Sequence, residues 1–493
     1  MFSFLISILA LVLGYLLYAR VVERVFKPDP SRVTPAVAMA DGVDYVPMPT
    51  WKVFMIQFLN IAGTGPIFGA IMGAKFGPSC YLWIVFGCIF AGAVHDYFSG
   101  MLSMRENGAT LPEMVGRELR CGSRTVIVVF TTLVMLMVGA VFVYSPALIL
   151  GDMAGDGSSS AVLIWAVVIL AYYVIATLLP VDKIIGKIYP VFAIALLFMA
   201  ASLLVCLLVK WPTIPEVWDG LQNRAPSVGV NGQSIFPCLF ITVACGAVSG
   251  FHGTQSPMMA RCLRNERLGR PVFYGAMIVE GLVALVWAAV SSYFFFDGGM
   301  AECGMQSASA PQVVTAVCKH WLGIAGSILA ILGVVAAPIT SGDTALRGVR
   351  INIAEFLHLR QDKIGNRLLV SVPIFIIVAL LLWFNISHED GFNVIWRYFG
   401  LSNQFLSTFM LGTATVYLVR RYPCGWQFLM TGIPAIFMYT VCFTFFCVDK
   451  TCLGMPAEWT GWIAMAWAVI ATLQLSVWVT SQKRKARSEI SLK

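Results

Sequence analysis

The chain has 493 residues, of which 59% are hydrophobic and 12% are charged, and its mean hydropathy is +0.81. A soluble domain carries about 25% charged residues, so this composition excludes a soluble enzyme and indicates an integral membrane protein. Apolar runs of about 20 residues recur along the chain, which is the length of a transmembrane helix rather than of a barrel strand. The net charge of +8 therefore belongs to loops at a membrane surface, and no nucleic-acid partner is expected.

Thirteen apolar runs predict an all-α protein with about 13 transmembrane helices. They cover residues 2–19, 53–73, 80–101, 125–150, 161–179, 188–209, 235–259, 271–296, 322–346, 366–384, 394–419, 426–448 and 458–480. Most of the 33 Lys and Arg residues lie in the loops that follow odd-numbered spans, so the positive-inside rule predicts these loops to be cytoplasmic. The N-terminus is then outside and the C-terminus in the cytoplasm. The first run has no basic segment before it, so we expect it to be retained as a helix rather than cleaved as a signal peptide.

Spans two to six and spans seven to eleven form two groups of five, and each group begins with an interrupted helix. Because five is an odd number, the two groups enter the membrane from opposite sides, which is typical of an inverted-topology repeat. One extra helix precedes the repeats and two follow them. The predicted divisions are 1–52 (N-terminal helix and cytoplasmic loop), 53–209 (first repeat), 235–419 (second repeat) and 420–493 (two C-terminal helices and a basic tail).

The first interrupted helix contains the sequence Asn60-Ile-Ala-Gly-Thr-Gly-Pro66. Gly63 and Gly65 let the backbone approach a ligand closely, and Pro66 is tolerated in the first turn of the next half-helix. That half-helix directs unpaired N–H groups and the positive end of its dipole into the break, where a carboxylate is favoured. The side chains of Asn60 and Thr64 add hydrogen bonds. The alternative is a packing kink with glycine at a helix crossing.

The second interrupted helix contains Ser249-Gly-Phe-His-Gly-Thr-Gln-Ser-Pro257. The predicted substrate-binding residues here are Gly250, His252, Gly253, Thr254 and Gln255. His252 binds a carboxylate when it is protonated, or carries a coupling proton, because the reference pKa of histidine is about 6.5. The alternative is a neutral histidine that bonds to an exposed backbone carbonyl.

Two further spans carry residues suited to a coupling cation. Glu280 lies near the middle of the eighth span, where an ionisable side chain is costly and marks a functional site by default. The ninth span ends with four polar residues, Thr340, Ser341, Asp343 and Thr344. Hydroxyl oxygens on one helix face suit sodium, whereas a buried Asp343 can carry a proton. The alternatives are a protonated Glu280 bonded to a neighbouring helix and an Asp343 paired with Arg347.

Polar residues also stand near the ends of the third and eleventh spans. Asp96 and Arg105 are predicted to form an ion pair that acts as a gate on the cytoplasmic side. The alternative is a solvated interfacial pair worth less than about 1 kcal/mol. Asn403 and Gln404 interrupt the eleventh span, where they either line the cavity or join helices through hydrogen bonds.

Four motifs together resemble the carbon starvation protein A (CstA) family. They are Phe58–Pro66, Ala91–Asp96, Arg105–Thr110 and Phe399–Gln404, and the resemblance covers about residues 50–450. It implies a LeuT/APC-like transporter of peptides or pyruvate that uses a proton or another cation gradient. His95 stands where the better-known members tend to have glutamine, and this chain is shorter than many of them, so the choice between pyruvate and peptide stays open.

These observations predict a secondary active transporter of the bacterial inner membrane that imports a small carboxylate (pyruvate) or short peptides by alternating access. Its partners are the substrate, the lipid bilayer and a coupling proton or sodium ion. No cofactor, resident metal or catalytic residue is expected, and the pattern predicts no particular oligomeric state. The alternatives are a channel, which requires a continuous polar stripe, and a membrane-embedded sensor or enzyme, which requires an output domain or a catalytic constellation.

Overall fold

The computed structural model describes residues 1–119, 122–154, 158–178, 181–230, 232–305, 308–359, 361, 363–388, 391–423 and 425–491. Every regular element in these ranges is a helix. In chain order the α-helices are α1 (Phe2–Leu13), α2 (Ala19–Phe26), α3 (Pro35–Ala38), α4 (Thr50–Ala62), α5 (Gly65–Ala74), α6 (Ser79–Gly87), α7 (Ala93–Arg105), α8 (Leu111–Leu119), α9 (Gly122–Ala154), α10 (Ser159–Leu178), α11 (Val181–Lys210), α12 (Phe240–Thr242), α13 (His252–Ala260), α14 (Gly275–Phe296), α15 (Gly299–Glu302), α16 (Ala310–Ala330), α17 (Ala336–Phe356), α18 (Ile364–Ser387), α19 (Gly391–Arg421), α20 (Leu429–Val448) and α21 (Thr460–Ser491). Short π-helical segments connect α1 to α2 and α6 to α7, and each of these pairs forms one span.

Nine helical segments of the described ranges are long and apolar enough to cross a membrane, and the bent pair α4–α5 makes a tenth candidate. These ten correspond to ten of the predicted spans. The other three predicted spans, 235–259, 322–346 and 394–419, correspond to the broken α12–α13 segment, to α16–α17 and to α19. The all-helical membrane architecture is therefore confirmed, whereas the count of thirteen and the five-plus-five layout stay predictions.

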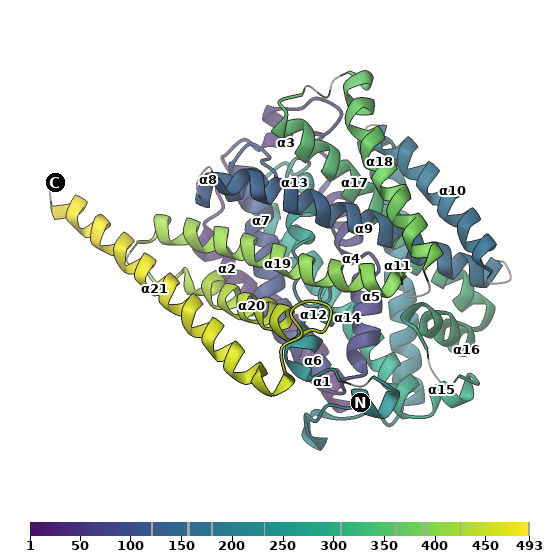
Figure 1. Cartoon of the computed structure of the whole chain (residues 1–493). Helices are drawn as coiled ribbons and strands as arrows, with labels where there is room; N and C mark the ends of the chain where they lie inside the picture. Colours follow the sequence, from purple (N-terminus) through teal and green to yellow (C-terminus); the bar gives the residue numbers. More distant parts are fainter. Residues whose placement is uncertain are drawn as a thin grey trace.

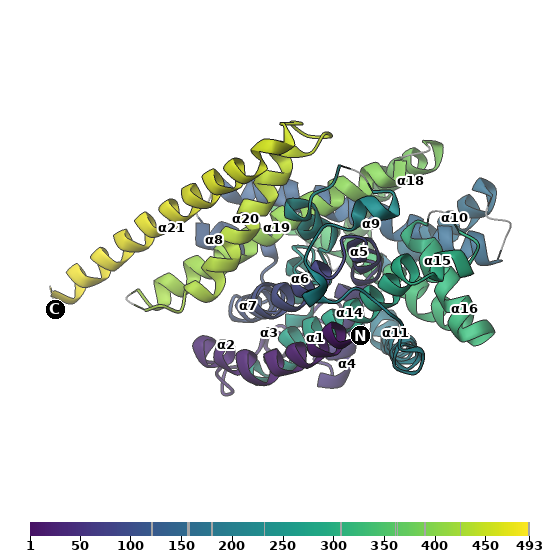
Figure 2. The same cartoon turned by 90° about the horizontal axis from the view of Figure 1, so that it is seen from below.

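The broken helices lie in the middle of the molecule, and longer helices surround them (Figure 1). Three of the main packing pairs are α17 along α9, α14 along α5 and α13 along α7. In both views α21 packs on α20 and then extends away from the other helices (Figures 1 and 2). Because only 6% of the most apolar part of this terminal helix is buried within the chain, it adds little to the core that holds the central residues.

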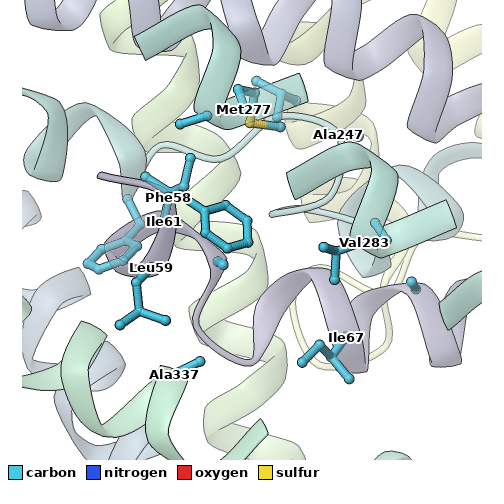
Figure 3. Close-up of a cluster of buried hydrophobic side chains, with 14 of the residues drawn as sticks. Phe58, Leu59, Ile61, Ile67, Ala247, Met277, Val283 and Ala337 are labelled. Carbon is cyan, nitrogen blue, oxygen red and sulfur yellow. The ribbon is translucent and has the colours of Figure 1, made fainter. Parts of the chain in front are cut away.

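The first predicted break is confirmed, because α4 and α5 are two halves of one span bent by 45°. Between them, Gly63 adopts φ +27° and ψ −142°, a conformation that L side chains rarely adopt. A Cβ atom at Gly63 would also lie 2.8 Å from the ring of Phe142. Figure 3 shows the irregular link between the two halves, with Leu59 on α4 and Ala337 on the neighbouring α17.

The second interrupted span consists of α12, the irregular residues 243–251 and α13. Helix α19 supplies partners for the freed backbone groups. The N–H of Phe251 donates to Oδ1 of Asn403 at 2.6 Å, and the N–H of Gly250 donates to the Asn403 carbonyl at 3.2 Å. Nε2 of Gln404 donates to the Phe240 carbonyl at 3.1 Å. These two side chains therefore join α19 to the break and replace the missing helical hydrogen bonds.

The second break begins and ends earlier in the chain than predicted, since Gly253, Thr254 and Gln255 lie inside α13. Pro257 has no N–H to donate to the Gly253 carbonyl four residues before it. The hydroxyl of Ser99 donates to that carbonyl instead, at 3.0 Å. A neighbouring helix thus satisfies the carbonyl, and α13 continues through the proline.

Candidate functional site

The two breaks touch each other in the centre of the protein. The backbone at Gly65 approaches Cys245 so closely that a Cβ atom would collide with the Cys245 side chain. The side chains of Asn60, Thr64 and Gln255 around this contact are fully buried. In this conformation the candidate site is therefore closed to solvent.

Each of these three side chains has an atom with no hydrogen-bond partner in the described part of the chain. The atoms are Nδ2 of Asn60, Oγ1 of Thr64 and Oε1 of Gln255. A buried polar group without a partner costs about 1–3 kcal/mol, so a polar ligand at this place would be stabilised by them. The amide of Gln255 donates to Thr254, and the Thr254 hydroxyl donates to the Phe251 carbonyl, so Thr254 fixes the orientation of Gln255.

A chain of four buried ionisable side chains lies beside the breaks. Nδ1 of His95 is 2.8 Å from one oxygen of Asp96, and Nδ1 of His252 is 3.1 Å from the other. Nε2 of His252 is 3.6 Å from Oε2 of Glu280. All four side chains are 0% exposed. They come from α7, α13 and α14, so this group of four side chains connects three helices across the second break.

The predicted gate between Asp96 and Arg105 is wrong. Both residues lie on α7, which continues to Arg105, and nine residues of α-helix span about 13 Å. Asp96 pairs with the two histidines, whereas Arg105 pairs with Glu266 at 3.2 Å and donates to the Tyr417 hydroxyl at 2.9 Å. Asp96 thus belongs to the central cluster.

Two of the polar residues of α17, Ser341 and Thr344, contact the first break. The Ser341 hydroxyl donates to the Leu59 carbonyl at 2.9 Å, and the Thr344 hydroxyl lies 3.4 Å from Oδ1 of Asn60. The Thr340 hydroxyl donates to the Ala337 carbonyl at 2.7 Å. These oxygens are the atoms that would coordinate a sodium ion. No group of three or more His, Cys, Asp or Glu residues in the described ranges is arranged to hold a metal ion.

Asp343 points to the other side of α17. Its Oδ2 accepts a hydrogen bond from the hydroxyl of Tyr189 at 2.7 Å, and that hydroxyl also lies 3.0 Å from the Thr340 carbonyl. Asp343 is fully buried. It is thus bonded to α11 and is not part of the cluster around His252.

Three important residues were not selected as site residues from the sequence. His95 extends the buried chain, and its adjacency to Asp96 in an apolar span was the available signal. Arg261 and Glu355 form an ion pair of 2.9 Å between the end of α13 and the end of α17. No local sequence pattern indicates this pair, because its members are 94 residues apart.

Two broken helices in contact, unsatisfied polar atoms at the breaks and buried ionisable residues beside them are the features of a membrane transporter's substrate site. The comparisons with known proteins agree. The family model of the carbon starvation protein CstA matches residues 1–163, 151–321 and 308–445, and the chain belongs to this family.

Two named relatives are transporters. Over an alignment of 556 positions, the chain is 26% identical to the peptide transporter CstA of Escherichia coli, and the alignment covers 86% of this chain and 78% of that protein. It is 29% identical over 338 residues to the pyruvate/proton symporter BtsT of E. coli, covering 56% of this chain and 46% of that protein. An uncharacterised membrane protein of Haemophilus influenzae is 44% identical over 339 residues, covering 60% of this chain and 91% of that protein.

Solved structures show the same fold at low sequence identity. A manganese transporter of Eremococcus coleocola has a TM-score of 0.54 at 13% identity and covers 91% of this chain and 99% of its own. A Na⁺-coupled sialic acid symporter has a TM-score of 0.53 at 13% identity and covers 96% and 98%. These neighbours have the LeuT-type fold, and at this identity they show the fold alone.

Proposed function

We propose that the protein is a secondary active symporter that imports a small carboxylate, pyruvate first and short peptides second. The observation that carries this proposal is the contact between the two breaks, where unsatisfied polar atoms lie beside the buried histidine–carboxylate chain. The names of the two E. coli relatives support both substrate classes. We place it in the bacterial inner membrane, with the N-terminus outside and the C-terminus in the cytoplasm as the positive-inside rule predicts.

The substrate carboxylate is placed at the first break. Asn60 Nδ2 and the backbone N–H groups of Gly63, Thr64 and Gly65 supply donors at the start of α5, where the helix dipole favours an anion. His252, at the start of α13, is the basic side chain that we place beside the carboxylate. Gly250 and Gly253 are assigned to packing. Asn403 lies against Gly250, and a Cβ atom at Gly253 would lie 3.2 Å from the His95 ring.

The coupling ion is assigned as a proton that moves between Glu280 and His252. Glu280 and His252 are buried together. Asp96 contacts the other ring nitrogen of His252, Nδ1, from the opposite side. A relative named as a pyruvate/proton symporter supports this assignment. The alternative is sodium at Thr340, Ser341 and Thr344, which the oxygen atoms facing the first break favour.

Alternating access then requires the broken helices to move relative to α17 and the helices that pack on it. The hydrogen bonds from Ser341 to Leu59 and from Thr344 to Asn60 cross this boundary. Occupation of the first break by substrate and ion changes these contacts, which links binding to the movement.

The test is uptake of labelled pyruvate or a dipeptide by the purified protein in liposomes, with proton and sodium gradients imposed separately. We expect a proton gradient to drive accumulation. His252→Ala should weaken substrate binding by more than tenfold, since it removes the basic side chain and leaves Asp96 with one partner fewer. His320→Ala, which removes an exposed histidine paired with Glu302, is the matched control.

Wild-type affinity in a folded His252→Ala protein would remove His252 from the site. Accumulation driven by sodium alone would replace the proton assignment with the α17 oxygen site. Folding of each variant is checked by its elution as a single species in detergent.

A further inference from the structure

A cavity of about 510 Å³ opens at one end of both broken spans. Its walls come from the end of α5, the chain before α12, α12 itself, the start of α19 and the end of α20. The positive-inside rule predicts all of these ends to be on the outer side, because the Lys- and Arg-rich loops are at the opposite ends. The cavity therefore lies where an incoming solute would first meet the two half-helices.

The charges in this cavity favour an anion. Lys75, Arg397 and Asp449 are its charged lining residues, which leaves a net positive charge. Lys75 is only 8% exposed, and its ammonium has one acceptor within 3.5 Å in the described ranges, the Ala308 carbonyl at 3.4 Å. The ammonium also lies 5.0 Å from the ring centroid of Phe295, and neither Ala308 nor Phe295 lines the cavity. An ammonium group has three donors, so its one bond to a carbonyl leaves donors for a ligand.

Among the described residues, the ionic partner of Arg397 in the cavity is a distant one. Its Nη1 lies 3.8 Å from Oδ1 of Asp449, and the same oxygen accepts hydrogen bonds from the N–H and hydroxyl of Thr451. The local turn at Thr451 thus partly satisfies Asp449, the one acidic residue among the described lining residues. A carboxylate entering the cavity would meet Lys75 and Arg397 as its charged donors.

A column of aromatic rings runs from this cavity to the breaks. Trp396 lines the cavity, and its ring centroid is 5.8 Å from that of Phe399. Phe399 is 6.4 Å from Phe142, and Phe142 is 6.0 Å from Phe251. Phe142 lies against Gly63 in the first break, and Phe251 directly precedes α13. A solute that moved along this column from the cavity to the central site would have to displace these rings.

We propose that this cavity is an outer antechamber that binds the carboxylate group of the substrate at Lys75 and Arg397 before the aromatic column opens. Its role in transport rests on the function proposed above. The carboxylate can belong to pyruvate or to the C-terminus of a short peptide, and a volume of about 510 Å³ holds either, since ligand pockets are commonly about 300–1,000 Å³.

The first test compares Lys75→Met with Lys319→Met, an exposed lysine outside the cavity. In right-side-out proteoliposomes, Lys75→Met should raise the apparent KM for the external substrate about tenfold, which is about 1.4 kcal/mol. The maximal rate at saturation should stay near the wild-type value, because the central site is unchanged. Lys75→Arg should restore the KM, because it keeps the positive charge. If Lys75 only supported the structure, the KM of Lys75→Arg would stay raised. Separate pyruvate and Ala-Ala arms identify the source of the carboxylate.

A KM within twofold of wild type for a folded Lys75→Met protein, with both substrates, would overturn the antechamber. If the wild-type chain transports neither substrate, the proposed function fails and the cavity is tested by binding alone. Pyruvate and Ala-Ala, but not Ala-Ala amide, should then protect Lys75 from an amine-reactive reagent in the detergent-solubilised chain, with Lys319 as the unprotected reference. Equal labelling of Lys75 in all samples would overturn the inference.

Discussion

The buried carboxylates differ in how their oxygens are satisfied. Asp96 is bonded through both oxygens to histidines, and Asp343 is bonded through one oxygen to Tyr189. Neither oxygen of Glu280 has a hydrogen-bond partner among the residues that the structure describes. A carboxylate in such a place is stabilised by binding a proton, and Nε2 of His252 lies 3.6 Å from its Oε2.

This difference leads to a prediction for Glu280→Gln. The amide keeps the shape of a protonated carboxyl group but cannot release a proton. We expect the variant to lose proton-driven accumulation and to retain exchange of substrate across the membrane at equal concentrations. Both are measured in the same liposomes, with Glu302→Gln, which changes an exposed acid, as the control. Normal accumulation in Glu280→Gln would assign the coupling proton to another group.

At the scale of elements, the second break depends on its contact with α19. A Cβ atom at Gly250 would collide with the backbone of Asn403 and Ser407. Only glycine at this position therefore lets α19 come close enough to form its hydrogen bonds with the break. The two N–H groups of Gly250 and Phe251 would lose their partners if α19 moved away. The break is thus a property of two segments far apart in the sequence.

Gly250→Ala should therefore destabilise the protein by about 1–3 kcal/mol through overpacking and should impair transport. Gly412→Ala is the matched change, because Gly412 lies inside α19 with no heavy atom within 4 Å of a Cβ position. That control should be neutral or stabilising by up to about 1 kcal/mol. Thermal unfolding of both variants in detergent is the measurement. A Gly250→Ala protein as stable as Gly412→Ala would contradict the role of this contact.

Sequence reasoning located the breaks because glycine, proline and polar residues in apolar runs are a local signal. It also selected His252 and Glu280, whose side chains are costly wherever they lie in a membrane. It misassigned Asp96, because the partner on α13 is 156 residues away and the end of α7 was placed too early. Asn403 had two open interpretations for the same reason. Contacts between distant segments decide these roles, and one sequence does not contain them.

At the scale of the whole molecule, the ends of α13 and α17 are joined on the predicted cytoplasmic side. Arg261, just after α13, pairs with Glu355 near the end of α17 at 2.9 Å and donates to the Gly108 carbonyl. The other oxygen of Glu355 accepts a hydrogen bond from Thr110 at 3.0 Å. We expect these contacts to separate when the central site opens to the cytoplasm. We therefore expect this pair, rather than Asp96 and Arg105, to act as the gate on this side.

Glu355→Gln should weaken this closed state, because the amide loses the charge that makes the bond to Arg261 strong. The neighbouring Cys262 is 1% exposed and has a free thiol, so its reaction with a maleimide reports opening at this end. We expect its labelling rate to rise about threefold to tenfold, as a change of about 1 kcal/mol in the balance of two conformations would produce. Glu118→Gln, which breaks the exposed pair with Arg420 on α19, should leave the rate unchanged. Equal rates in Glu355→Gln and Glu118→Gln would show that opening does not pass through the Arg261–Glu355 contact.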